Sequence, residues 1–133
     1  MKKLFAILLV TLLTSCGAAL EPPKSNTDYK NIIGKSIKIG NLEIAQYDFP
    51  DKMNLNDAKK ACADLGEGWK LPSQDELNYL YENKVAIGGF ANNRYWSSTE
   101  YASNFAWYQG FNDGSQGFNR KDYAYYVRAI RAF

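Results

Sequence analysis

The strongest constraint on the fold is a change in hydrophobic periodicity near residue 90. Between residues 54 and 82 the apolar side chains recur at helical spacing, whereas after residue 90 they fall in short aromatic or β-branched runs. Gly, Asn, Asp and Ser separate these runs, which is typical of tight turns between antiparallel strands. The pattern predicts helices followed by a small β-meander that ends in residues 123–133, and therefore an α+β domain.

Residues 54–66, NLNDAKKACADLG, are predicted to form the first of two helices. Their apolar residues fall at i, i+3, i+4 and i+7 from Ala58, so they share one helical face. An asparagine, Asn54 or Asn56, can cap the start, and Gly66 can end the helix.

A capping box predicts the second helix. Ser73 is followed three residues later by Glu76, and in this arrangement each side chain accepts a hydrogen bond from the backbone N–H of the other residue. Pro72 keeps the helix from starting earlier. Leu77 and Leu80 then begin the apolar face.

Residues 36–46, SIKIGNLEIAQ, predict a β-hairpin before these helices. Two short runs of alternating apolar and polar residues flank Gly40 and Asn41, and a two-residue loop that begins with glycine is a common hairpin turn. The expected order is therefore a hairpin, two helices and the meander.

The first 17 residues have the pattern of a bacterial lipoprotein signal. Lys2 and Lys3 precede an apolar run of about ten residues, which is too short to span a bilayer. The run ends in Leu-Thr-Ser-Cys, which resembles the lipobox, and this resemblance implies cleavage after residue 15 and acylation of Cys16. Gly17, where aspartate would retain a protein in the inner membrane of enteric bacteria, implies an outer-membrane location under that rule. An ordinary signal peptide with an incidental Cys16 is the alternative.

The chain is expected to divide into a signal peptide, a tether and one domain. Residues 1–15 are the signal peptide, and residues 16–31 are expected to be a lipidated, flexible tether because they are rich in Pro, Ser, Asn and charge. Folding is expected to begin near Ile32, so that residues 32–133 form the domain. Aromatic residues make up 15% of the chain and lie mostly after residue 90, where their large side chains can build the core of a small domain.

Composition excludes several kinds of chemistry. The chain has no histidine, which excludes Ser-His-Asp and Cys-His catalysis and removes the usual zinc ligands. Its two cysteines are Cys16 and Cys62, so lipidation of the first leaves no partner for a disulfide or a cysteine-rich metal site. No glycine-rich nucleotide motif occurs. Carboxylate pairs remain available for glycoside hydrolysis, but no spacing singles one out. We therefore expect no cofactor, no metal and no catalytic site.

Charge argues against a nucleic-acid partner. The whole chain has 16 basic and 14 acidic residues, and removal of Lys2 and Lys3 with the signal leaves 14 of each. A neutral protein has no bulk attraction to nucleic acid. Residues 84–133 nevertheless carry 6 basic and 3 acidic residues. That asymmetry favours an acidic ligand on the C-terminal half, with scattered surface charge as the alternative.

Five segments together resemble a known family. In chain order they read NLNDAKKAC, GWKLPSQDEL, YWSSTE, FAWYQGFNDGS and YVRAIR. The series is similar to the C-terminal domain of the Legionella collagen-like adhesin and to Fibrobacter-type paralogous domains, over about residues 36–133. The resemblance implies a C-type-lectin-like fold, related to that of formylglycine-generating enzymes. For the adhesin it also implies trimerisation and binding to sulfated glycosaminoglycans. This sequence has no collagen-like stalk, so the avidity and the trimeric arrangement of the adhesin are not expected here.

The sequence departs from that family in its cysteines. In the family, the helix cysteine that corresponds to Cys62 commonly pairs with a cysteine in the last strand, where this chain has Ala129. A crosslink worth roughly 2–4 kcal/mol is therefore missing. Cys62 is expected to be a small buried apolar residue, with intermolecular pairing as the alternative. Arg128 and Arg131 should point to opposite faces of a strand, and one of them is expected to bind a carboxylate such as Glu76.

Two polar segments have competing interpretations. Residues 111–113, Phe-Asn-Asp, superficially resemble the Trp-Asn-Asp calcium tripeptide of C-type lectins, but the E-P-N or Q-P-D loop that completes the site does not occur. We interpret residues 112–115 as a hairpin turn and predict no calcium dependence. Residues 96–100, WSSTE, would suit a sugar-facing strip. We favour the alternative, in which Trp96 lies in the core and the hydroxyls bind the backbone.

The expected ligand surface is aromatic and basic. It comprises Trp107, Tyr108, Arg120, Lys121 and Tyr123. Aromatic faces stack on sugar rings, and basic side chains bind sulfate or carboxylate; the alternative is that these residues merely cover the core. The sequence thus predicts a lipid-anchored, non-catalytic protein of the cell envelope that binds a glycan or a surface protein. A structural lipoprotein that contacts other envelope proteins is the alternative, and an enzyme of the formylglycine-generating type, which would need a cysteine pair, is least favoured.

Overall fold

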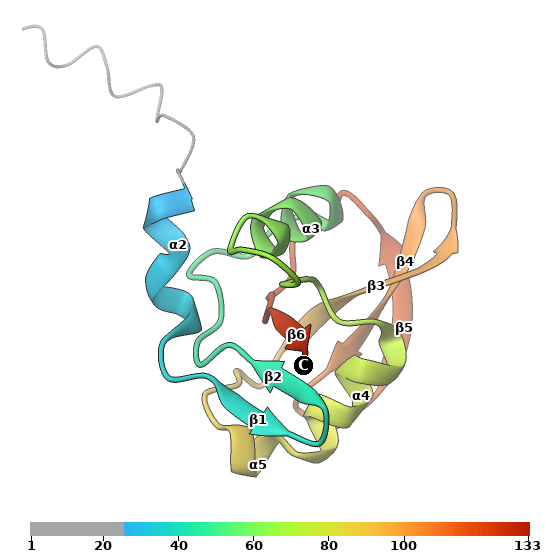
Figure 1. Cartoon of the computed structure of the whole chain (residues 1–133). Coiled ribbons are helices and arrows are strands. Elements are labelled where there is room, and N and C mark those ends of the chain that lie inside the picture. The colour runs from blue at the N-terminus through green and yellow to red at the C-terminus, as the bar shows by residue number, and fades with distance from the viewer. Residues whose placement is uncertain (1–25) are drawn as a thin grey trace, which may run out of the picture.

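The computed structural model describes residues 26–133 and contains two small antiparallel sheets with helices packed around them (Figure 1). The first sheet has the order β1-β2-β6, with β1 at Ile37–Ile39, β2 at Leu42–Ile44 and β6 at Ile130–Ala132. The second has the order β3-β4-β5, with β3 at Arg94–Ala102, β4 at Phe105–Gly110 and β5 at Gln116–Arg120. The helices are α2 at Asn26–Ile33, α3 at Leu55–Ala63, α4 at Gln74–Glu82 and α5 at Lys84–Ile87.

The predicted hairpin and both predicted helices are confirmed. The side chain of Asn54 caps α3 by accepting a hydrogen bond from the backbone N–H of Asp57 at 2.9 Å. The capping box of α4 is complete, because the Ser73 hydroxyl accepts from the Glu76 N–H at 3.2 Å and the Glu76 carboxylate accepts from the Ser73 N–H at 2.9 Å. These helices begin where their local signals predict.

The meander differs from the prediction in its last strand. Strands β3, β4 and β5 follow one another as expected, but β6 leaves them and pairs antiparallel with β2, so that Glu43 lies opposite Arg131. An alternating pattern indicates that a segment is a strand and says nothing about which edge it joins. In Figure 1 the C-terminal strand accordingly lies beside the N-terminal hairpin.

Helix α2 begins inside the segment that was expected to be a tether. The helix spans residues 26–33, although the polar composition of residues 16–31 does not predict a helix there. The Tyr29 ring packs edge-on against Phe49, with ring centroids 5.0 Å apart, and Ile32 is buried. These long-range contacts supply the apolar burial that the local composition does not reveal. The predictions for the signal peptide, for Cys16 and for the first part of the tether lie outside the described residues.

Consecutive residues of β3 serve two separate hydrophobic clusters. Tyr95 and Trp96 are both fully buried, and they point to opposite faces of the strand. Trp96 shares its cluster with Cys62 and Ala129, which are also fully buried. Cys62 is therefore confirmed as a small buried residue of the core.

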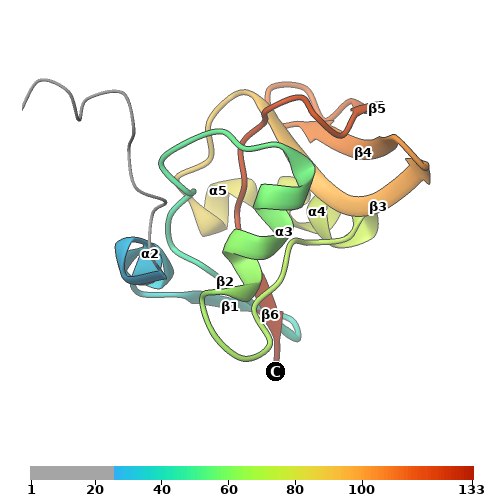
Figure 2. The same ribbon diagram turned by 90° about the horizontal axis from the view of Figure 1, so that it is seen from above.

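Helix α2 and the β3–β4 hairpin mark opposite sides of the domain. In both views, α2 lies on one side of the molecule and the tip of the β3–β4 hairpin lies on the opposite side (Figures 1 and 2). Within residues 26–133, no helix has the length and apolar character needed to cross a membrane.

Candidate binding surface

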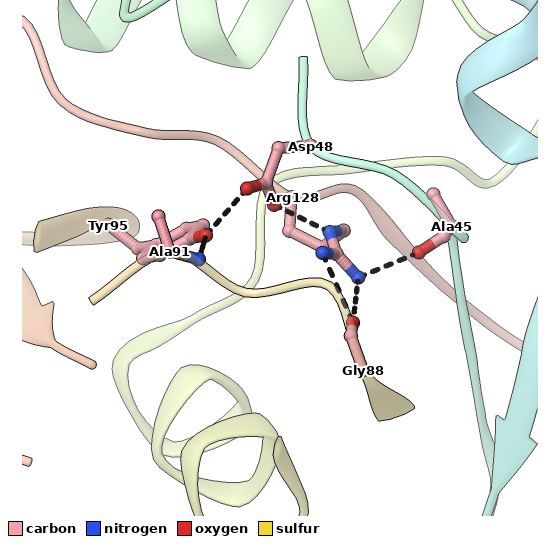
Figure 3. Close-up of polar contacts among 6 residues, drawn as sticks. All are labelled: Ala45, Asp48, Gly88, Ala91, Tyr95 and Arg128. Carbon is pink, nitrogen blue, oxygen red and sulfur yellow. Dashed lines mark hydrogen bonds and ion pairs between the residues drawn. The ribbon is translucent and has the colours of Figure 1, made fainter. Parts of the chain in front are cut away.

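Arg128 lies at the centre of a buried polar network (Figure 3). Its Nε donates a hydrogen bond to one carboxylate oxygen of Asp48 at 2.7 Å, and its Nη atoms donate to the carbonyl oxygens of Ala45 and Gly88 at 3.2 and 3.4 Å. The second Asp48 oxygen accepts a hydrogen bond from the Tyr95 hydroxyl at 2.6 Å. The network joins β3, the loop after β2, the loop after α5 and the C-terminal segment.

The charged side chains of this network, Arg128 and Asp48, pair with each other inside the fold. Burial raises the pKa of Asp48, while the charge of Arg128 and the hydroxyl of Tyr95 act to lower it. Burial also raises the pKa of Tyr95. Gly89 has a φ of 79°, and a Cβ at this position would lie 3.3 Å from an Arg128 nitrogen, so the loop approaches closely because it has no side chain here. The Arg128 guanidinium lies 4.1 Å from the centroid of the Phe90 ring. The network braces the fold and offers nothing to a ligand.

The expected pairing of an arginine with Glu76 is wrong. The Glu76 carboxylate accepts the Ser73 N–H of the capping box and therefore stays at the N-terminus of its own helix. Arg128 pairs with Asp48, and Arg131 pairs with Glu43 at 2.8 Å. The different partners agree with the expectation that the two arginines point in different directions.

Four aromatic side chains gather on one face of the β3–β4–β5 sheet, near the tip of the β3–β4 hairpin. The rings of Tyr101 and Phe118 stack with centroids 3.8 Å apart and planes 7° apart. Trp107 lies edge-on to both of them, at 5.6 and 5.5 Å, and Phe105 lies edge-on to Phe118 at 6.1 Å. Tyr101 is 52% exposed and Phe118 is 44% exposed. We call these four residues the aromatic patch.

A cleft of about 730 Å³ lies beside the aromatic patch, between the start of α3, the β3–β4 turn and the segment that follows β5. Its walls are held together by the backbone, because the Leu55 N–H donates to the Lys121 carbonyl and the Lys121 N–H donates to the Asn104 carbonyl, each at 2.9 Å. Phe105 belongs to both the cleft and the patch. We call this the polar cleft; it is lined by Asn54, Asn56, Asp57, Ser103, Asn104, Phe105, Arg120, Lys121 and Asp122.

Two predicted ligand residues, Arg120 and Lys121, line the polar cleft, and both are paired. Arg120 contacts Asp122 at 2.6 Å. Lys121 contacts Glu100 at 3.2 Å, and Lys59 approaches the same carboxylate at 3.6 Å. The hydrogen bond and charge of Lys121, followed by the charge of Lys59, lower the pKa of Glu100. The cations at this end of the sheet are therefore balanced by carboxylates.

The other predicted ligand residues are divided between the two faces of the sheet. Trp107 belongs to the aromatic patch, whereas Tyr108, the next residue of β4, points to the opposite face. There Tyr108 and Tyr123 contact Tyr125, with ring centroids 5.2 and 6.5 Å apart, and Arg94 lies over the Tyr108 ring at 4.7 Å. The structure does not bring the five predicted residues into one site.

Comparison with known proteins places this arrangement in a family. A family model described as the Lcl C-terminal domain matches residues 30–131. The chain belongs to the Lcl C-terminal domain family. No curated protein sequence matches it.

Solved structures establish the fold of this Lcl C-terminal domain. Botrocetin is similar with a TM-score of 0.59 and 9% identity, over 75% of this chain and 98% of botrocetin. A chain from a complex of a mutant von Willebrand factor A1 domain with botrocetin has a TM-score of 0.55, 10% identity and the same coverage. EMS16, described as an antagonist of a collagen receptor integrin, has a TM-score of 0.55 and 10% identity, over 74% of this chain and 97% of EMS16. The predicted α+β, C-type-lectin-like fold is confirmed.

In this Lcl C-terminal domain, Trp96, Ser97 and Thr99 have the structural roles that we favoured. Trp96 is fully buried. The Ser97 hydroxyl donates to the Trp107 carbonyl at 2.7 Å, and the Thr99 hydroxyl accepts from the Gln74 N–H at 2.8 Å. The hydroxyls bind backbone groups and join β3 to β4 and to the start of α4.

Residues 112–115 form the predicted turn, at the opposite end of the sheet from the polar cleft. The Asp113 carboxylate accepts a hydrogen bond from the Ser115 N–H at 2.9 Å, and Gly114 has a φ of 81°. The turn's own backbone lowers the pKa of Asp113. Over the part of the chain that the structure describes, no three His, Cys, Asp or Glu side chains are grouped as metal ligands would be.

The predicted ligand surface did not include Tyr101, Phe105 and Phe118, which complete the aromatic patch. Side chains two residues apart in a strand share a face. The sequence therefore indicates that Phe105 and Trp107 share a face of β4 and that Phe118 and Arg120 share a face of β5. The register between the strands, which brings these pairs together, is not visible in the sequence.

Proposed function

We propose that this domain is a non-catalytic recognition module that binds carbohydrate across the aromatic patch and the polar cleft. The observation that carries the proposal is the exposed stack of Tyr101 on Phe118 beside a cleft lined by amides and paired charges. Flat ring faces pack against the C–H faces of sugar rings, and amides and carboxylates bind sugar hydroxyls. The surface is built on strands of a sheet, which hold it in a defined geometry.

The side chains of the domain favour binding over catalysis. The sequence contains no histidine. Cys62 is buried, and burial raises its pKa, so its thiol is not suited to act as a nucleophile. The carboxylates of the polar cleft, Asp57 and Asp122, are exposed, and each already has a partner, because Asp57 accepts a hydrogen bond from the Asn54 amide at 3.2 Å and Asp122 pairs with Arg120.

We also propose that lipid on Cys16 holds the domain at the outer membrane. The signal-like sequence before Cys16 supports this. Helix α2 lies on the side of the domain away from the β3–β4 hairpin (Figures 1 and 2). A chain tethered through α2 would present the aromatic patch away from the membrane. Mass spectrometry of the mature protein should find an acylated residue 16, and a Cys16→Ser variant should leave the membrane fraction. An unmodified cysteine would contradict the anchor.

A glycan array with two tyrosine variants tests carbohydrate binding. Tyr101→Ala removes half of the exposed stack, and Tyr47→Ala removes an equally exposed tyrosine, 52% in each case, that does not belong to the patch. The wild-type protein should bind a subset of glycans, Tyr101→Ala should bind them at least about tenfold more weakly, and Tyr47→Ala should bind normally. Silence of the wild type over the whole array would refute the proposal.

A protein ligand is the second candidate. The structurally similar botrocetin was solved in complex with a von Willebrand factor domain, and an exposed aromatic patch also suits a protein partner. Crosslinking in cells would favour this candidate if one envelope protein dominated and Tyr101→Ala abolished its capture.

A further inference from the structure

We infer that the polar cleft selects an uncharged, hydroxyl-rich oligosaccharide and discriminates against sulfated or carboxylated ones. The inference rests on the proposed function and specifies its ligand. It follows from how the charges of the domain are paired and from what the cleft offers as hydrogen-bond donors and acceptors.

The basic side chains of residues 84–133 already have partners within the domain. Four of its six basic residues pair with a carboxylate, and two of those carboxylates, Asp48 and Glu43, come from the N-terminal half of the chain. Of the other two, Lys84 donates to a backbone carbonyl at 2.7 Å, and Arg94 lies over a tyrosine ring. The asymmetry seen in the sequence therefore does not produce a basic field at the cleft.

The charges that line the cleft are equal in number. Arg120 and Lys121 are the cations, and Asp57 and Asp122 are the anions. Arg120 is already held by Asp122 at 2.6 Å. A sulfate that approached Arg120 would lie beside this carboxylate, so the attraction to the guanidinium and the repulsion from Asp122 offset each other.

The hydrogen-bonding groups suit hydroxyls better than anions. A sugar hydroxyl both donates and accepts, whereas a sulfate only accepts. Asn56, Ser103 and Asn104 are exposed in the cleft, and within residues 26–133 their side chains form no hydrogen bond, so they present both donors and acceptors. The carboxylate oxygens of Asp57 and Asp122 add further acceptors, which a hydroxyl can satisfy and a sulfate cannot.

The size of the surface indicates more than one sugar unit. The cleft volume of about 730 Å³ lies within the range of roughly 300–1,000 Å³ that is usual for small-molecule sites. Phe105 forms part of the cleft wall and packs edge-on to Phe118, so the cleft and the aromatic patch adjoin and together offer room for a second sugar unit.

Matched neutral and sulfated oligosaccharides test the inference. The mature full-length protein is titrated with neutral glucan, galactan and xylan oligosaccharides and with the sulfated form of each backbone, in 50 to 500 mM NaCl. We expect binding to a neutral member, at least about tenfold weaker binding to its sulfated form, and less than about twofold change with salt. Preference for sulfated members, with affinity that falls as salt rises, would overturn the inference and leave the proposed function standing. Absence of binding to every member and to the glycan array would overturn the proposed function itself.

Asp122→Asn locates the selectivity in the cleft. The variant removes one acceptor and frees Arg120, so binding of the neutral oligosaccharide should fall about tenfold while binding of its sulfated form should rise. Glu67→Gln removes the same charge from an exposed residue outside the cleft and should change neither affinity. Equal effects of the two variants would show that net charge, and not the cleft, sets the preference, and would overturn the inference. Thermal unfolding verifies that both variants are folded.

Discussion

Two arginine–aspartate pairs of almost the same length lie in opposite surroundings. The Arg128–Asp48 contact is 2.7 Å long and its side chains are 0% and 15% exposed, whereas the Arg120–Asp122 contact is 2.6 Å long and its side chains are 60% and 61% exposed. The buried pair also binds two backbone carbonyls and a tyrosine hydroxyl, while the exposed pair borders the polar cleft. The length of an ion pair therefore does not reveal its role; burial and the number of other partners do.

The buried pair lies where the family resemblance implies a crosslink. Ala129 stands at the position of the missing cysteine and is packed in the same cluster as Cys62. The preceding residue, Arg128, ties this C-terminal segment to Asp48. In this domain the segment is thus held by side-chain packing and by a largely buried polar network.

The largest expected effect is that of Arg128→Ala. The variant leaves the Asp48 carboxylate buried without its cation, removes a donor from two carbonyls and opens a cavity, so it should lower the free energy of unfolding by roughly 3–5 kcal/mol. Urea unfolding followed by tryptophan fluorescence measures the change. An unchanged midpoint would mean that the buried and exposed pairs are equivalent after all.

An intermediate effect is expected at Glu43, whose carboxylate binds Arg131 at 2.8 Å and the Ser36 hydroxyl at 2.5 Å. The hydrogen bond from Ser36, followed by that from Arg131, lowers the pKa of Glu43 below its ordinary value of 4.5. Its contribution to stability is therefore complete above pH 4.5 and is lost as the pH falls through the lower folded-state pKa. Glu43→Gln should cost about 1 kcal/mol at pH 7 and should flatten the loss of stability in acid.

Urea unfolding at pH 7, 5 and 3.5 measures this dependence, with Glu67→Gln as the exposed control. Asp48 contributes a slope of opposite sign, because burial raises its pKa, so the effect of Glu43 is obtained from the difference between variant and wild type at each pH. A Glu43→Gln variant whose stability falls in acid as steeply as that of the wild type would contradict the assignment.

The parts of the fold that could be predicted from the sequence have local signals. The capping box at Ser73 and Glu76 fixes the start of α4 within four residues of chain, and the cap at Asn54 does the same for α3. The partner of Arg128 is 80 residues away, and no local pattern distinguishes Asp48 from the other carboxylates. The pairing of β6 with β2 could not be predicted for the same reason, because these two strands are far apart in the sequence.

The candidate site was predictable only in part for a related reason. Composition indicated the end of the chain that carries the proposed surface and included Trp107 and Arg120, but adjacent residues of a strand alternate in direction, which separates Trp107 from Tyr108. The register of β3 against β4 shifts between Trp96 and Glu100 and again after Glu100. Bulges of this kind change which residues of β3 lie opposite β4, and they leave no mark in the alternation of the sequence.

The smallest effect on stability is expected from Arg120→Ala. The pair with Asp122 is exposed and screened by solvent, so its loss should change the free energy of unfolding by less than about 0.5 kcal/mol, in low salt and in high salt alike. Urea unfolding beside Arg128→Ala measures the contrast. A loss of more than about 1 kcal/mol would show that the cleft, too, is braced by its charges. A silent variant would mean that the Arg120–Asp122 pair does not stabilise the fold, so its effect on ligand selection in the cleft, where each charge offsets the other, can be measured separately from stability.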